Sequence, residues 1–455
     1  MQSKYVSINP YTGESYGEFP YTSDEQLELA LQKAVVAQDR WAAIPIKERR
    51  WVWNSIADLL TKRQSSLARL ITEEMGKPIA QSHKEIEKCA WLCRYAAQHG
   101  WHWLQPEQRD GSHLYNQVFF RPLGVVLGIM PWNFPFWQVF RYAVPALTAG
   151  NVTILKHAEN VPRSAQAIED LFREAGLMEG LLQNLFLTHE QVAVAIADPR
   201  VRGISLTGSD RAGRIVASQA GRHLKKSVLE LGGSDPLIIL PDVENLAQVI
   251  KKAVAARMQN SGQSCIAAKR IFIHANRWDE SIQLLKAELK RLKVGDPMDP
   301  QTQVGPLARA DLADNLMAQV EDALAKGSKV IAGKCHREGN LVFPHALFPI
   351  PSDARARYEE LFGPVACLYR FSTYEALIHE VNTSPYGLGC SIWTSNVEVA
   401  YRLAEQIEAG TVAINTITAS EPALPFGGVK NSGIGRELGK EGFREFVNVQ
   451  TIYES

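Results

Sequence analysis

The chain has 455 residues, long enough for two or three domains with a large buried core. Its 49 Lys and Arg residues balance its 49 Asp and Glu residues, and this zero net charge argues against nucleic acid as a partner. A composition of 45% hydrophobic and 22% charged residues is typical of globular proteins and excludes general disorder.

The N-terminal segment MQSKYVSINPYTGE has neither the apolar core of a signal peptide nor the arginines of a transit peptide. The six cysteines form no CxxC pair and no regular framework. In a long chain without a signal, this usage is typical of reduced thiols. We therefore expect a cytoplasmic protein.

The first hundred residues are predicted to be largely helical. One helix is expected near residue 24, because Ser23 and Gln26 have the spacing of a capping box. Residues 114–122, LYNQVFFRP, are predicted to form a strand outside the main sheets.

Residues 122–140 carry no charge and approach the length of a membrane-spanning helix. Pro131 and Pro135 interrupt this stretch, so one continuous helix is not expected. We predict a buried strand (GVVLGIM), a turn (PWNFP) and then a helix. No membrane partner is expected.

From residue 152 onward, short apolar segments alternate with helical ones. The predicted strands of this region are VTILK, NLFLT, GISLT, KSVLEL, PLIIL and RIFIH. Such alternation predicts an α/β fold with parallel sheets. Two α/β domains are expected, divided near Leu231. Residues 443–455 are predicted to form a terminal strand that pairs outside the main sheets, with a second subunit as one option.

Cys265 lies in the segment NSGQSCIAAKR, where small and polar residues precede the thiol. Gly262 and its small neighbours favour a close approach of substrate and backbone. A thiolate attacks carbonyl carbons readily once its pKa is lowered by its surroundings. The segment alone leaves two interpretations open, a nucleophile and an inert buried cysteine.

Two polar residues are further candidates for catalysis. Glu230 ends an apolar strand, and strand ends in α/β folds face the ligand crevice, where a carboxylate can act as a general base. Asn133 is held between two prolines, and a rigid amide can donate to a developing oxyanion. The plainer alternatives are a solvated strand-end charge for Glu230 and a turn residue for Asn133.

The segment LTGSDRAG, residues 206–213, follows a predicted strand and opens a predicted helix. Gly208, Ser209 and Gly213 predict a close turn with free N–H groups at a helix N-terminus, which suits a pyrophosphate. It does not match GxGxxG and is a weak signal alone. No motif predicts a metal site; His99 and His102 form a lone pair in a Trp-rich segment.

The motifs PWNFP, LKHAE, LTGSDRAG, LELGGSDP, NSGQSC, EELFGPV and PFGGVKNSGIGRELG occur in one order. In this combination the chain resembles the aldehyde dehydrogenase superfamily over nearly its whole length. The details ELGGSDP and QNSGQSCIAAKR resemble a bacterial branch of succinate-semialdehyde dehydrogenases. The resemblance implies a Rossmann-like cofactor domain, an α/β catalytic domain and a small β extension for oligomerisation.

The domain boundaries implied by the resemblance are as follows. The NAD(P)-binding domain is placed at residues 1–113 and 123–230, and the catalytic domain at residues 231–423. The oligomerisation strands are placed at residues 114–122 and 424–455. A homodimer or a homotetramer is expected, and the sequence does not choose between them.

The resemblance also implies the activity, an NAD(P)-dependent oxidation of an aldehyde to a carboxylic acid. Cys265 is expected to attack the aldehyde and form a thioester after hydride transfer. Asn133 is expected to hold the oxyanion, and Glu230 to activate the water that releases the acid. Succinate semialdehyde is the expected substrate. The alternatives are a general dehydrogenase for uncharged aldehydes and an inactive structural protein with the same fold.

Cofactor binding is assigned by the resemblance to Trp132, Lys156, Glu159, Gly208, Ser209, Gly213, Glu360 and Phe362. Glu159 is expected to accept hydrogen bonds from the ribose hydroxyls of NAD and to repel a 2′-phosphate. Lys156 partly offsets that repulsion. NAD is therefore the expected cofactor, with NADP possible.

Substrate binding is assigned to Phe134 and Phe426 as apolar walls and to Arg141 as the partner of a substrate carboxylate. The chain departs from the family pattern at two places. Gln259 stands where many succinate-semialdehyde dehydrogenases carry an arginine. Glu437 matches a glutamate that some members pair with a lysine, but Tyr142 stands at the position of that lysine.

Overall fold

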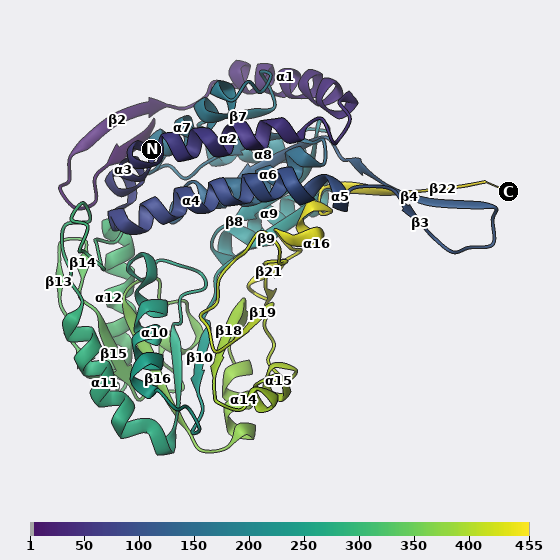
Figure 1. Ribbon diagram of the computed structural model, residues 1–455. Helices are drawn as coiled ribbons and strands as arrows, with labels where there is room; N and C mark the ends of the chain where they lie inside the picture. The colour runs from purple at the N-terminus through teal and green to yellow at the C-terminus, as the bar shows by residue number, and fades with distance from the viewer. Residues whose placement is uncertain (1–3, 455) are drawn as a thin grey trace.

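The computed structural model describes residues 4–454. Its N-terminal part is a hairpin followed by helices: β1 (Lys4–Ile8), β2 (Ser15–Pro20), α1 (Asp24–Ala43), α2 (Arg50–Lys62), α3 (Gln64–Met75) and α4 (Ile79–Tyr95). The predicted capping box is confirmed, because the Ser23 side chain accepts from the Gln26 N–H while the Gln26 side chain accepts from the Ser23 N–H. These helices cover one side of the molecule (Figure 1).

The first large sheet has six strands in the order β21-β9-β8-β5-β6-β7. Its strands are β5 (Val125–Ile129), β6 (Val152–Lys156), β7 (Leu182–Asn184), β8 (Val201–Thr207), β9 (Lys226–Glu230) and β21 (Gly433–Ile434). Strands β5 to β9 are parallel, and β21 is antiparallel to β9. The intervening helices are α6 (Trp137–Thr148), α7 (Pro162–Glu174), α8 (His189–Ala197) and α9 (Asp210–Arg222).

Two predictions for this region have clear outcomes. The uncharged residues 122–140 contain a strand, a turn and a helix, as predicted. Within residues 4–454, no helix is both long and apolar enough to cross a membrane. The strand predicted at NLFLT is misplaced. Only Asn184 of that segment belongs to β7, because Phe186 and Leu187 instead accept hydrogen bonds from Thr22 and Tyr5 near the N-terminus.

The second large sheet has seven strands in the order β12-β15-β16-β11-β10-β18-β19. Its strands are β10 (Pro236–Ile239), β11 (Arg270–His274), β12 (Lys329–Gly333), β15 (His345–Phe348), β16 (Val365–Phe371), β18 (Gly389–Trp393) and β19 (Thr411–Ile414). Its helices are α10 (Leu246–Met258), α11 (Trp278–Arg291), α12 (Ala310–Ala325), α14 (Tyr374–Asn382) and α15 (Val397–Ala404). All its strand pairs are parallel except β12 with β15.

The chain passes from the first large sheet to the second between Glu230 and Pro236, and it returns after β19. The returning segment includes β20 (Val429–Lys430), β21 and α16 (Gly439–Phe443). Gly433 of β21 pairs with Glu230 at the end of β9. Part of the range 424–455 therefore belongs to the body of the molecule, where it supports the end of β9.

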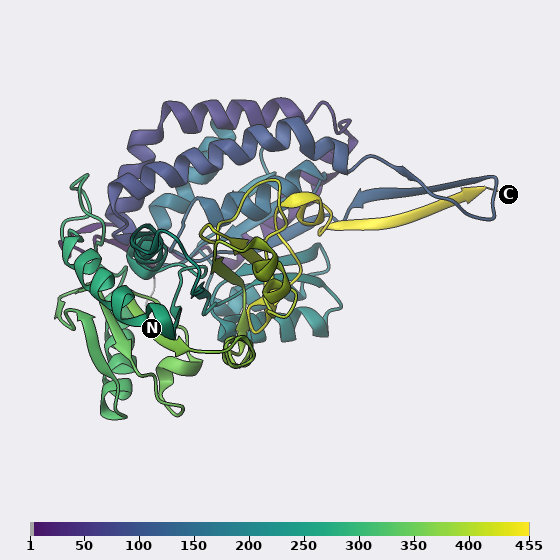
Figure 2. The same ribbon diagram turned by 60° about the horizontal axis from the view of Figure 1, so that its bottom comes forward.

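An arm formed by a small sheet projects from the body (Figures 1 and 2). It consists of β3 (Glu107–Gln108), β4 (Tyr115–Pro122) and β22 (Val447–Glu454), in the order β22-β4-β3. The strands predicted at 114–122 and 443–455 are thus present, and they pair with each other in one antiparallel ladder.

Candidate active site

Cys265 lies in the loop between α10 and β11, half-buried at the wall of a cavity of about 510 Å³. The loop turns through two left-handed residues, Asn260 (φ 52°) and Ser261 (φ 56°), before Gly262 (φ 77°). A side-chain carbon on Gly262 would lie 2.3 Å from the carbonyl carbon of Gly363. Gly262 is therefore required for the contact between two backbone segments, and its part in substrate approach stays a prediction.

A buried lysine holds the backbone at the thiol. Lys269 Nζ donates to the carbonyl oxygens of Ser264 (2.6 Å) and Cys265 (2.7 Å) and forms an ion pair with Glu360 Oε1 (3.0 Å). Burial raises the pKa of the Cys265 thiol to about 11, although Arg141 and Lys269 act to lower it. At neutral pH the thiol is thus protonated, and it must lose its proton before it can attack a carbonyl.

Glu230 ends β9 as a buried carboxyl group. Neither of its oxygens has a hydrogen-bond partner within residues 4–454. Burial raises the pKa of Glu230 well above its usual range, with Arg141 opposing the shift and Glu437 adding to it. A carboxyl group whose pKa is raised holds a proton more readily, which suits proton exchange with water.

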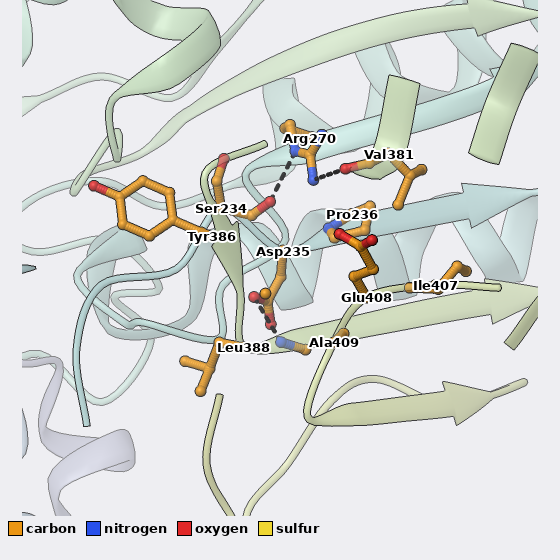
Figure 3. A pocket seen from close by; sticks show the side chains of 12 residues that line it. Ser234, Asp235, Pro236, Arg270, Val381, Tyr386, Leu388, Ile407, Glu408 and Ala409 are labelled. Carbon is orange, nitrogen blue, oxygen red and sulfur yellow. Dashed lines mark hydrogen bonds between the residues drawn. The ribbon is translucent and has the colours of Figure 1, made fainter. Parts of the chain in front are cut away.

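The loop after Glu230 passes directly against the Cys265 segment. A side-chain carbon on Gly233 would lie 2.6 Å from the Cys265 carbonyl oxygen, so this close approach requires a glycine. The loop is fixed at its other end, where Arg270 Nε donates to the Ser234 carbonyl (2.8 Å; Figure 3). Asp235 accepts from the Gly389 N–H (3.0 Å). The cavity drawn there has about 10 Å³ and is too small for a substrate.

Asn133 is buried in the PWNFP turn and bonded to the loop of Cys265. Its Nδ2 donates to the Gln263 carbonyl (3.1 Å), while Asn260 Nδ2 donates to the Asn133 carbonyl (2.7 Å). A side-chain amide has two hydrogens, so one remains for a ligand oxygen. The structure thus brings together the three segments that carry the predicted catalytic residues, whose roles stay predictions.

The three predicted substrate-binding residues line the same cavity as Cys265, and so does Gln259. Arg141, however, already has partners: its guanidinium lies 4.5 Å from the centre of the Phe426 ring and forms a buried ion pair with Glu437. Burial opposes the charge of Arg141, but Glu437 and Glu230 raise its pKa. The partner of Glu437 is thus Arg141, and Tyr142 fills the space that Gly128 leaves open.

Replacing Arg141 with alanine is expected to lower the free energy of unfolding by about 3–5 kcal/mol, because Glu437 is left buried without its counter-charge. Chemical unfolding at fixed protein concentration measures this loss. The double variant Arg141→Met, Glu437→Leu removes both charges and should recover most of the stability. An Arg141→Ala protein as stable as the original chain would contradict the buried pair.

Lys156 and Glu159 line a second cavity, of about 710 Å³, together with Asn160. Lys156 has no ion-pair partner within residues 4–454; burial lowers its pKa, and Glu159 opposes the shift. Neither polar atom of the buried Asn160 amide has a hydrogen-bond partner in the described chain. An unpaired cation beside an unpaired amide fits a ribose that carries hydroxyl or phosphate groups.

The other predicted cofactor residues form two groups. Ser209 is the N-cap of α9, and its side chain accepts from the Ala212 N–H (3.3 Å). A side-chain carbon on Gly208 would make only an ordinary contact, whereas one on Gly213 would clash with the Leu231 side chain. These residues do not line the Lys156 cavity.

The second group lies beside the Cys265 segment. The rings of Trp132 and Phe362 meet edge-to-face at 5.8 Å, and Glu360 Oε1 accepts from the Gly233 N–H (3.1 Å). Through its contacts with Lys269 and Gly233, Glu360 is tied to the segments that carry Cys265 and Glu230.

Sequence reasoning missed five residues of these sites that the argument uses: Lys84, Lys88, Asn160, Lys269 and Ser420. The signal for Lys88 was its spacing of four residues from Lys84, which puts both on one face of α4. Such spacing is common on solvated helix faces and is weak evidence alone. Within residues 4–454, no group of three or more His, Cys, Asp or Glu side chains could hold a metal ion.

Known proteins are similar to this chain over nearly its whole length. The succinate-semialdehyde dehydrogenase [NADP(+)] of Deinococcus radiodurans is 43% identical, covering 98% of this chain and 94% of the relative. The probable succinate-semialdehyde dehydrogenase [NADP(+)] of Synechocystis is 44% identical, covering 98% and 99%. A crystal structure of succinic semialdehyde dehydrogenase from Streptococcus pyogenes, in complex with NADP⁺, is 37% identical with a TM-score of 0.96, covering 99% of each chain.

These relatives overturn the expectation that NAD is the preferred cofactor, because each of them is named for NADP⁺ or was crystallised with it. The prediction gave too much weight to the repulsion between Glu159 and a 2′-phosphate. Glu159 is only partly buried, so water screens its charge. The ammonium of Lys156 lies in the same cavity without a carboxylate partner in residues 4–454 and offsets the repulsion.

The family model for the aldehyde dehydrogenase family matches residues 1–452. The match spans both large sheets and the arm, and it includes every residue predicted for catalysis or binding. The chain belongs to the aldehyde dehydrogenase family.

Proposed function

We propose that this protein oxidises succinate semialdehyde to succinate, with NADP⁺ as the electron acceptor. The observation that carries the proposal is the cavity at Cys265, in which the thiol shares one space with Lys84, Lys88 and Arg141. Such a cavity suits a short aldehyde with a negatively charged tail. The names of the relatives from Deinococcus and Synechocystis support the same substrate and cofactor.

The chemistry follows from the groups around the thiol. Cys265 Sγ passes its proton to solvent water and adds to the aldehyde carbon, and the oxygen of the resulting hemithioacetal accepts from Asn133 Nδ2 and the Cys265 N–H. NADP⁺, when bound, supplies the acceptor for the hydride that leaves this carbon. The product on the protein is a thioester at Cys265. Glu230 then takes a proton from water, which attacks the thioester, releases the acid and restores the thiol.

Lys156 and Asn160 are proposed to hold the phosphorylated ribose of the cofactor, since both are without partners inside the described chain. The N–H groups at the start of α9, beside Gly208 and Ser209, are proposed to face the pyrophosphate. Trp132, Glu360 and Phe362 are proposed to face the nicotinamide end, because they adjoin the Cys265 segment.

The domain division and the assembly are proposed as well. The six-stranded sheet would belong to the cofactor domain and the seven-stranded sheet to the catalytic domain. The arm is proposed to join subunits in a homodimer or homotetramer, because it exposes Leu114, Val449 and Tyr453. Six unpaired cysteines support a reducing compartment such as the cytoplasm.

The test is steady-state kinetics with succinate semialdehyde and with butanal, each with NADP⁺ and with NAD⁺. We expect the highest kcat/KM for succinate semialdehyde with NADP⁺, about tenfold or more above butanal if one charge-assisted contact holds the tail. Equal efficiency on both aldehydes would favour a general aldehyde dehydrogenase. No oxidation of any aldehyde would favour an inactive protein, and a higher kcat/KM with NAD⁺ would contradict the cofactor proposal.

A further inference from the structure

Lys88 projects from α4 into the cavity that Cys265 lines. Its Nζ donates to Ser420 Oγ (2.8 Å) and lies 4.4 Å from the centre of the Trp137 ring. Both partners are neutral, and within residues 4–454 no carboxylate lies at ion-pair distance from this ammonium. Lys88 therefore brings to the wall of the cavity a positive charge that has no ion-pair partner among the described residues.

The charged and titratable groups around Lys88 come from three elements. Arg141 acts on it from α6, Glu421 from the segment after β19, and Glu85 and Cys89 from α4 itself. Burial and Arg141 lower the pKa of Lys88 to about 8, with the other groups opposing this shift. Lys88 is thus mostly charged at neutral pH, although burial and the nearby Arg141 disfavour the charged form.

Two of these ions, Arg141 and Glu85, already form ion pairs with other residues, whereas Glu421 is exposed and forms no ion pair within residues 4–454. Arg141 is paired with Glu437. Glu85 is paired with Lys77 and accepts from the N–H groups of Phe136 (2.9 Å) and Trp137 (3.0 Å) at the start of α6. Arg141 therefore has a direct ion-pair partner inside the protein, whereas Lys88 has none among the described residues and only the more distant Glu421 and Glu85 favour its charge.

We propose that Lys88 binds the carboxylate tail of the substrate and sets the preference for aldehydes that carry an acid group over uncharged ones. The carboxylate supplies the counter-charge that Lys88 lacks, and Ser420 and Trp137 hold the ammonium in place before the substrate arrives. The inference rests on the proposed function and adds the residue that reads the tail. It moves this role from Arg141, which the sequence favoured, to a residue of a different helix.

The test is the ratio of kcat/KM for succinate semialdehyde to kcat/KM for butanal. Lys88→Met removes the charge at similar length, and we expect the ratio to fall by about 10–100-fold, mainly through KM for succinate semialdehyde. Lys88→Arg keeps the positive charge. In this variant the logarithm of the kcat/KM ratio should therefore keep at least half of its value in the original protein. The matched control is Lys47→Met, since Lys47 is exposed and its Nζ also lies over a tryptophan ring, that of Trp101, at 4.7 Å.

The pH dependence of the same ratio gives a second readout, in which the titration of Cys265 cancels because it affects both aldehydes. Lys88 is charged below its pKa and neutral above it, so the ratio should be highest below about pH 7 and fall as the pH rises through about 8. In Lys88→Arg the guanidinium stays charged, so this fall should disappear.

The outcomes separate the two proposals. An original protein that shows no preference for succinate semialdehyde over butanal would overturn the proposed substrate. A clear preference that survives Lys88→Met and does not change between pH 7 and pH 9 would overturn the role of Lys88 alone. An equal loss on both aldehydes in Lys88→Met, together with lower thermal stability, would show that Lys88 supports only the fold.

Discussion

Replacing Cys265 with alanine is expected to lower kcat for aldehyde oxidation by about 10⁴-fold or more, because no other thiol of the described residues lines this cavity and could form the thioester. The thiol lies in the cavity with the cationic side chains, and its loop is bonded to the PWNFP turn. NADPH formation at saturating succinate semialdehyde measures the loss. NADP⁺ binding, followed by protein fluorescence, should change little, because the residues proposed to hold the ribose line a different cavity.

A second cysteine provides the control for this experiment. Cys335 is also half-buried but does not line the Cys265 cavity, so Cys335→Ala should retain turnover. Appreciable oxidation by Cys265→Ala would remove the thiol from the mechanism. A loss of NADP⁺ binding in that variant would point to general disruption of the site.

Replacing Glu230 with glutamine is expected to slow steady-state turnover by about 10²–10⁴-fold, the range for loss of a general base. Glutamine keeps the shape of the buried side chain but cannot take a proton from water. Acylation of Cys265 does not require this proton transfer in the proposed sequence. A rapid burst of NADPH, approaching one per active site, should therefore persist in stopped-flow absorbance while turnover nearly stops.

The matched control is Glu437→Gln, which neutralises the second buried carboxylate that interacts with Arg141. This variant should not separate the burst from turnover, because Glu437 forms an ion pair with Arg141 rather than activating water. Disappearance of the burst in Glu230→Gln would contradict the assignment. It would show that Glu230 is needed earlier, as the base for a thiol whose pKa burial raises to about 11.

The fold was predictable where the signal was local. VTILK forms β6 over the predicted residues, and Ser23 caps α1, because apolar patterning and capping act over a few residues. Pairings between distant segments were not predictable. That β4 pairs with β22, and that Gly433 pairs with Glu230, depends on how the chain returns after β19.

In the site, too, local signals were predictable and contacts between distant segments were not. The local segments made Cys265, Glu230 and Asn133 candidates, the family resemblance gave them joint roles, and the structure places their segments in contact. The ion pair of Arg141 with Glu437 could not be foreseen, since the two are far apart in sequence and neither motif refers to the other. Lys88 was missed because a lysine pair on a helix looks like a solvated face until the cavity beside it is known.

The central claim is that oxidation proceeds through an acyl group on Cys265, and mass spectrometry of the Glu230→Gln variant tests it most directly. The variant is mixed with succinate semialdehyde and NADP⁺, quenched with acid, digested and analysed. The account predicts the added mass of one succinyl group on the peptide that contains Cys265, formed in step with the NADPH burst. NADPH formation without an adduct, or with an adduct confined to another cysteine, would contradict it.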